Sequence, residues 1–175
     1  EGGSCTNTAF STIVAHEWGH GLDARYGGIA NTTAEGLSEG WGDIVGLYLI
    51  DSPILGSGFA NPGVGIRHGD NTRVWPYFGG SPHSAGQVWM GWAWRFREAL
   101  RANYGTATAI QVSNDLVIGS IVADATTRRD AVLEVFLADD DDGNLLNGTP
   151  HFLELQSASQ QKGIPYPNVT FTTFG

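Results

Sequence analysis

Two histidines four residues apart, His16 and His20, enclose a glutamate, Glu17, in the stretch 16–20. Side chains at positions i and i+4 lie on the same face of an α-helix, so both imidazoles can reach one metal ion. Glu17 is then held near the metal without binding it, as a zinc-activated water with a carboxylate base requires. The spacing therefore predicts a hydrolytic zinc centre. The alternative interpretation is a buried helix with two hydrogen-bonded histidines and a surface glutamate.

A catalytic zinc ion needs a third protein ligand and one open position for water. A third histidine six residues after His20 is ruled out, because that position holds Tyr26. A glutamate from the next helix is the alternative, and Glu39 is the favoured candidate. Asp43 lies one turn after Glu39 on the same face, where it can hydrogen-bond the far nitrogen of a ligating histidine. Glu35, one turn before Glu39, is the competing candidate and has no such acid in register.

Apolar spacing and capping residues predict the helices that must position these side chains. The fold is expected to be mainly α, with helices over 9–25, 34–50, 82–103, 107–123, 128–138 and 150–161. Expected N-caps are Thr32 or Thr33 for the second helix, Ser81 (before Pro82) for the third, Thr127 for the fifth and Thr149 for the sixth. The tryptophans and other aromatic residues of 82–103 are expected to form core.

The second helix carries three internal glycines, Gly40, Gly42 and Gly46, on or beside the face that holds Glu39 and Asp43. Each glycine costs a helix interior up to about 1 kcal/mol relative to alanine. A purely solvated acidic face would not need them. The glycines therefore predict that another helix or a metal site approaches this helix closely.

Length and charge limit the classes of function. A chain of 175 residues is expected to form a single domain, 1–175. Its 18 acidic and 9 basic residues give a formal charge of −9, which argues against a nucleic-acid partner. No apolar run approaches the roughly 20 residues of a membrane helix, so no membrane partner is expected. The acidic composition and the single lysine, Lys162, fit a secreted protein, and the lone Cys5 has no internal disulfide partner.

The acidic run at 139–142 is a candidate calcium site through Asp139, Asp140 and Asp142. It is not an EF-hand loop, because Ala138 occupies the first ligand position when Gly143 is placed at the obligatory glycine. The alternative interpretation is a solvated turn between two helices.

With these residues in view, the chain resembles the gluzincins, the thermolysin-like zinc metallopeptidases, and most closely the fungalysin branch. The second motif of that branch, E-G-W-S-D, is matched here by 39–43, with Gly42 in place of serine. The stretch 83–89 is similar to the fungalysin H-x-x-G-E-V-W segment and begins with His83. The resemblance implies a helical catalytic domain with a zinc helix and a C-terminal helical bundle.

The same resemblance implies roles for individual residues. His16, His20 and Glu39 would bind zinc, and Asp43 would orient a zinc ligand. Glu17 would be the general base for a peptide-bond hydrolase, and His83 would stabilise the oxyanion. Protein or peptide substrates and an extracellular location follow from the same resemblance.

Two departures from the family pattern matter. The acid found five residues before the oxyanion histidine is Phe78 here. Family members also carry a β-rich subdomain before the zinc helix, whose edge strand holds the substrate, and only fifteen residues precede His16. The sequence is thus expected to be either the C-terminal part of a longer enzyme, lacking an N-terminal segment, or an unusually compact one with little or no upstream sheet.

The motifs and the resemblance leave three candidate functions. The leading prediction is a secreted zinc-dependent metalloendopeptidase. The second is a zinc-binding domain without peptidase activity, which the presence of Glu17 argues against because a structural zinc ion needs no base. The third is a zinc aminopeptidase, which would need an acidic anchor for the free amine of the substrate.

Overall fold

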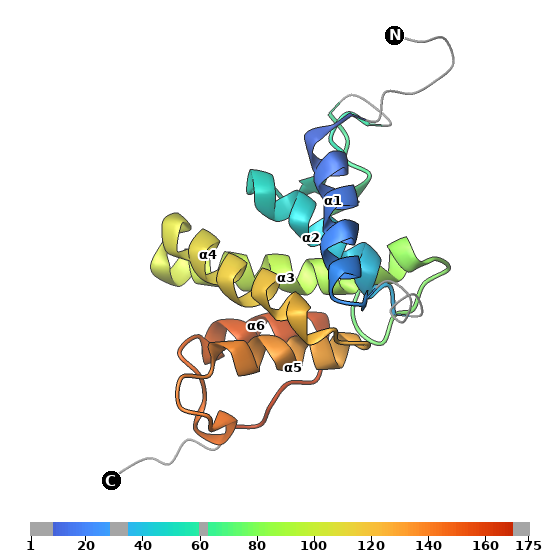
Figure 1. Cartoon of the computed structure of the whole chain (residues 1–175). Coiled ribbons are helices and arrows are strands. Elements are labelled where there is room, and N and C mark those ends of the chain that lie inside the picture. The colour runs from blue at the N-terminus through green and yellow to red at the C-terminus, as the bar shows by residue number, and fades with distance from the viewer. Residues whose placement is uncertain (1–8, 29–34, 60–62, 170–175) are drawn as a thin grey trace, which may run out of the picture.

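A computed structural model describes residues 9–28, 35–59 and 63–169 of the chain (Figure 1). Within these residues the chain is mainly helical, which confirms the predicted class. The expected caps Thr32 and Thr33 and the lone Cys5 lie outside the described residues. The elements are α1 (Ser11–Arg25), α2 (Leu37–Ile50), β1 (Ile54–Leu55), β2 (Arg67–His68), α3 (Pro82–Tyr104), α4 (Thr106–Ser113), η2 (Asn114–Ile118), η3 (Gly119–Ala123), α5 (Arg128–Asp139), η4 (Leu145–Asn147) and α6 (Phe152–Lys162).

Helix α3 crosses the middle of the molecule, with α1 and α2 on one side and α5 and α6 on the other (Figure 1). Its aromatic side chains are core, as expected: Trp89, Trp92 and Phe96 have no exposed surface. Trp92 stacks between the other two rings, at centroid distances of 5.0 and 5.8 Å. Its indole N–H donates to the Ser159 hydroxyl at 2.9 Å, which ties α6 to α3. Burial of these large rings fixes the helix that carries His83.

Helix α2 is largely buried up to Tyr48, because α1 packs against one of its faces and α3 against another, and only its last two residues are exposed. The glycines of α2 permit the close approach of both neighbouring helices, as predicted from the helix stability that internal glycines cost. A Cβ on Gly40 would lie 2.9 Å from the Gly86 oxygen of α3, and a Cβ on Gly46 would lie 2.8 Å from the Thr12 oxygen of α1. Neither neighbour is the end of a flexible side chain, so a larger residue would force the helices apart.

The helix expected over 107–123 changes its pitch twice. Regular α-helix ends at Ser113, a π-helical turn follows in η2, and a 3₁₀ turn follows in η3. The change begins where the buried Arg97 guanidinium of α3 bonds the Ser113 hydroxyl and the Asn114 side-chain oxygen. These hydrogen bonds tie the side chains at the change of pitch to α3, and a sequence periodicity does not report such tertiary contacts.

Two of the expected N-caps, Ser81 and Thr127, are present, and the predicted Thr149 cap is wrong. Ser81 accepts from the Ser84 N–H at the start of α3, and Thr127 accepts from the Asp130 N–H at the start of α5. The sixth helix was predicted to follow a Thr149 cap, but α6 begins at Phe152. The Thr149 hydroxyl instead donates to an Asp139 carboxylate oxygen at 2.6 Å, so it bonds the end of α5 rather than the start of α6.

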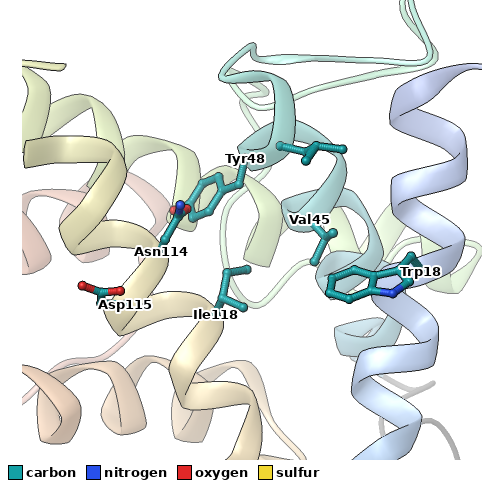
Figure 2. A pocket seen from close by; sticks show the side chains of 7 residues that line it. Trp18, Val45, Tyr48, Asn114, Asp115 and Ile118 are labelled. Atoms are coloured by element: carbon teal, nitrogen blue, oxygen red, sulfur yellow. The ribbon is translucent and has the colours of Figure 1, made fainter. Parts of the chain in front are cut away.

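Helix α1 buries a face of small and polar residues and leaves two of its large apolar residues mostly exposed. Val14 and Trp18 are 57% and 63% exposed, whereas His16 and Gly19 are buried. A groove of about 260 Å³ lies beside Trp18. Figure 2 shows Trp18 on one side of this groove, with Val45 of α2 beside it and Ile118 of η2 opposite. Within the part of the chain that the structure describes, no helix is both long and apolar enough to cross a membrane.

Candidate metal centre

Helix α1 places both histidines of the first motif on its inner side, against α2. His16 is 4% exposed and His20 is half-buried. Their rings meet edge to face, with centroids 4.6 Å apart and an interplanar angle of 86°. The helical spacing therefore brings the two imidazoles together, as the i, i+4 pattern predicts.

Glu39, in the first turn of α2, faces both rings. Its Oε2 atom lies 3.3 Å from His16 Nε2 and 3.7 Å from His20 Nε2. One donor atom from each of the three residues lies within 4.8 Å of the other two, so together they can hold one metal ion. The competing candidate, Glu35, is used elsewhere: its carboxylate accepts from the backbone N–H of Arg128 at 2.7 Å and pairs with its guanidinium.

Asp43 holds the far nitrogen of His16. Its Oδ1 atom lies 2.8 Å from His16 Nδ1, and the carboxylate is fully buried. Arg67 of β2 donates to both oxygens of this carboxylate at 2.7 Å. Sequence analysis missed Arg67. No local motif marks it, since it reaches the site only because β2 pairs with β1 and Leu55 stands opposite Arg67.

His20 is held in a similar way through a hydroxyl group. Its Nδ1 atom lies 3.0 Å from the Oγ of Ser38. Ser38 also hydrogen-bonds Asp23, a buried residue one turn after His20 on α1. Burial raises the pKa of Asp23, and the hydrogen bond from Ser38 opposes that shift. In both histidines Nδ1 is engaged, and Nε2 is the nitrogen that faces Glu39.

The two helices can bring these groups together because glycines line their contact. A Cβ on Gly19 of α1 would lie 2.8 Å from Cα of Gly42, and a Cβ on Gly42 would lie 2.7 Å from His16 Nδ1. Real Cβ contacts essentially never fall below 3.0 Å. The predicted close approach at Gly42 is thus an approach of the His16 ring itself.

The electrostatics of the centre favour a bound cation. Burial disfavours charge on His16, but the adjacent Asp43 and Glu39 carboxylates outweigh it and raise the pKa of His16 to about 9. Burial likewise opposes ionisation of Glu39, yet the imidazoles of His16, His20 and His83 around it hold its pKa far below the usual range. The carboxylates therefore stabilise positive charge at the imidazoles. Two imidazoles and one carboxylate are also the ligand types of a catalytic zinc ion, so the residues fit that metal.

His83, in the first turn of α3, lies at the rim of the same centre. Its Nδ1 atom is 2.5 Å from Glu39 Oε2, and more than half of its side chain is exposed. Glu17 is exposed on α1 and makes no hydrogen bond or ion pair within the described residues. Phe78, where the family carries an acid, instead packs its ring 5.1 Å from the guanidinium carbon of Arg128.

The candidate calcium residues do not form one group. Asp139 is buried and bonds the His151 backbone N–H at 2.7 Å and the His151 ring at 2.6 Å. The carboxylates that lie within 4.8 Å of one another are those of Asp140, Asp141 and Asp142. Two of these also accept backbone N–H groups of their own turn. Calcium binding stays a prediction for Asp140 and Asp142, and Asp139 serves the contact between α5 and the segment before α6.

Comparisons with protein-family models, with curated proteins and with solved structures found no match for this chain. The geometry of the centre and the motifs that carry the resemblance are therefore what indicate a function for this chain.

Proposed function

We propose that this chain is the catalytic domain of a zinc-dependent metalloendopeptidase. One observation carries the proposal: the Nε2 atoms of His16 and His20 converge on one oxygen of Glu39, while the Nδ1 atoms are engaged by other groups. Three protein ligands leave one position open for water, as in catalytic rather than structural zinc sites. Zinc bound there would acidify that water and polarise a substrate carbonyl.

We assign the remaining chemistry to Glu17 and His83. Glu17 is adjacent to a ligand in sequence and has a solvent-facing carboxylate without a partner among the described residues. In this proposal its carboxylate takes a proton from the attacking water and delivers it to the leaving amine. His83, now paired with Glu39, turns its ring to donate a hydrogen bond to the developing oxyanion. Asp43 and Arg67 hold the His16 ring in place.

The test is cleavage of unfolded casein by the whole chain, with zinc content measured in parallel. Glu17→Gln should retain zinc and lose at least about 100-fold in rate, because general base catalysis contributes that much. Glu134→Gln on α5, a glutamate with no part in the centre, is the matched control and should cleave as the wild type does. A wild-type protein that takes up no zinc, or a Glu17→Gln variant that cleaves normally, would end the proposal.

A second candidate is a zinc-binding domain without peptidase activity. The observation that favours it is the scarcity of sheet: β1 and β2, two residues each, are the strands in the described residues, and the resemblance implies substrate held on an edge strand. Zinc uptake without casein cleavage would support this candidate. Release of single N-terminal residues, with no internal cleavage, would instead indicate an aminopeptidase.

A further inference from the structure

Ser38 lies between a proposed zinc ligand and a buried carboxylate. Its Oγ is 3.0 Å from His20 Nδ1, and it hydrogen-bonds Asp23 as well. Both neighbours come from α1, three residues apart and therefore on one side of that helix. Ser38 and Asp23 are 5% and 3% exposed, so water does not replace either contact. The three residues form a relay that runs from the buried Asp23 through the buried Ser38 to the half-buried His20.

The chemistry of the three groups gives the relay a direction. A serine hydroxyl carries one hydrogen, and an ionised carboxylate only accepts. When Ser38 donates to Asp23, its oxygen is left to accept from His20, so the imidazole hydrogen must be on Nδ1. The Nε2 lone pair is then free on the side that faces Glu39. A hydroxyl without the carboxylate behind it could equally donate to Nδ1, which would put the hydrogen on Nε2.

We infer that Asp23 is a positioning residue that fixes, through Ser38, the metal-binding tautomer of His20. Asp43 does the same for His16 by direct contact, so each histidine has its own buried carboxylate. The inference extends the proposed function, since it assigns a task in the zinc centre to a residue outside the ligand motifs.

The surroundings of Asp23 are built around its carboxylate. A Cβ on Gly28 would lie 2.1 Å from Asp23 Oδ1, so glycine is required where the chain passes this group. Asp124, which follows η3, is the second acid in this region, and its Oδ2 atom lies 3.0 Å from where a Cβ on Gly27 would be. The charge of Asp124 raises the pKa of Asp23, so Asp124→Asn leaves Asp23 ionised and the relay in place, which makes it a suitable control.

The test reads the His20 tautomer directly in zinc-free protein. Long-range ¹H–¹⁵N correlation spectra distinguish Nδ1–H from Nε2–H, and His20→Gln assigns the signal. At a pH where His20 is neutral, the wild type and the Asp124→Asn control should show Nδ1–H. Asp23→Asn and Ser38→Ala should shift the ring toward Nε2–H, since an amide can donate to Ser38 and alanine offers no hydroxyl.

Zinc affinity, measured by competition with a chelator, gives the second readout. Loss of an outer hydrogen-bond partner weakens metal binding by about 10- to 100-fold. Because Asp23 acts through Ser38, the double variant should bind zinc no more weakly than Ser38→Ala alone. If Asp23 were only structural, Asp23→Asn would lower the stability of the fold, and its effect on zinc affinity would add to that of Ser38→Ala.

Two results would overturn the inference: Nε2–H on His20 in the wild type, or Nδ1–H unchanged in Asp23→Asn. If near-ultraviolet circular dichroism shows that Asp23→Asn is unfolded, Ser38→Ala tests the same relay with Asp23 intact. The spectra need no metal. A protein that shows the expected tautomers and binds no zinc would therefore refute the proposed function and leave the relay standing.

Discussion

Replacement of Gly42 by alanine tests the α1–α2 contact that creates the metal centre. The added Cβ would lie 2.7 Å from His16 Nδ1 and 2.9 Å from the His16 backbone oxygen. Ordinary contacts begin at 3.4 Å, so the ring must move by about 0.7 Å or the helices must separate. Movement of the ring breaks the 2.8 Å contact to Asp43, and separation moves His16 away from Glu39.

The magnitude follows from two opposing effects. Overpacking a tight contact lowers the free energy of unfolding by about 1–3 kcal/mol, whereas alanine in a helix interior raises it by up to about 1 kcal/mol relative to glycine. We expect zinc-free Gly42→Ala to be destabilised by about 1–2 kcal/mol, which lowers the melting temperature by roughly 2–8 °C in a chain of this size. Zinc affinity should fall by at least about 10-fold, because a ligand and its hydrogen-bond partner are both displaced.

Gly21→Ala is the matched control, since it makes the same change in α1. No atom lies within 4 Å of a Cβ at Gly21, so only the helix propensity changes. This variant should gain up to about 1 kcal/mol and bind zinc as the wild type does. Thermal unfolding of zinc-free protein and chelator competition measure both quantities. If Gly42→Ala also gained stability and kept its zinc affinity, the described packing of His16 against α2 would be incorrect.

Three further predictions concern single contacts. Burial, together with nearby arginines, lowers the pKa of Lys162 to about 8 from an unfolded value of 10.5, so the unfolded chain binds more protons between these pH values. Stability should therefore rise with pH over that window, by roughly 3 kcal/mol relative to Lys162→Met, and equal pH slopes for the two proteins would contradict this. Arg67→Met leaves the buried Asp43 carboxylate without its bidentate partner and should lower the free energy of unfolding by denaturant by about 3 kcal/mol. Arg67→Lys should cost less, and an Arg67→Met variant as stable as the wild type would refute the pairing. Thr127→Ala should cost about 1 kcal/mol through loss of the α5 cap, and Thr127→Ser should restore most of it; equal stability of the two variants would exclude the cap.

Local rules predicted the parts of the site that depend on one helix or one spacing. The i, i+4 pattern gave the two histidines, and the register of Glu39 with Asp43 distinguished that glutamate from Glu35. The three glycines of α2 predicted close approaches that the structure contains at Gly40, Gly42 and Gly46. In each case the signal is an energetic cost or a periodicity within one segment, which a single sequence reports directly.

Contacts that depend on how segments cross could not be predicted. Arg67 meets Asp43 only through the pairing of β1 with β2, and Ser38 meets Asp23 only through the α1–α2 crossing. The apolar spacing of α1 predicted a helix but did not identify its inner side. Trp18 belongs to that apolar set and is mostly exposed, whereas Gly19 is buried because only a small residue fits against α2.

The charge balance of the centre explains why these contacts must act together. Asp43 is buried beside Arg67, so its charge is matched by a permanent cation. Among the described residues, the basic groups within ion-pair distance of Glu39 are all histidines. Imidazoles match a carboxylate only when they are protonated or when they share a metal ion with it. With each Nδ1 engaged, the positive charge that Glu39 requires can enter only on the Nε2 side. The Asp43 and Glu39 carboxylates favour such a proton and so raise the pKa of His16, and a zinc ion would satisfy both rings and the carboxylate at once.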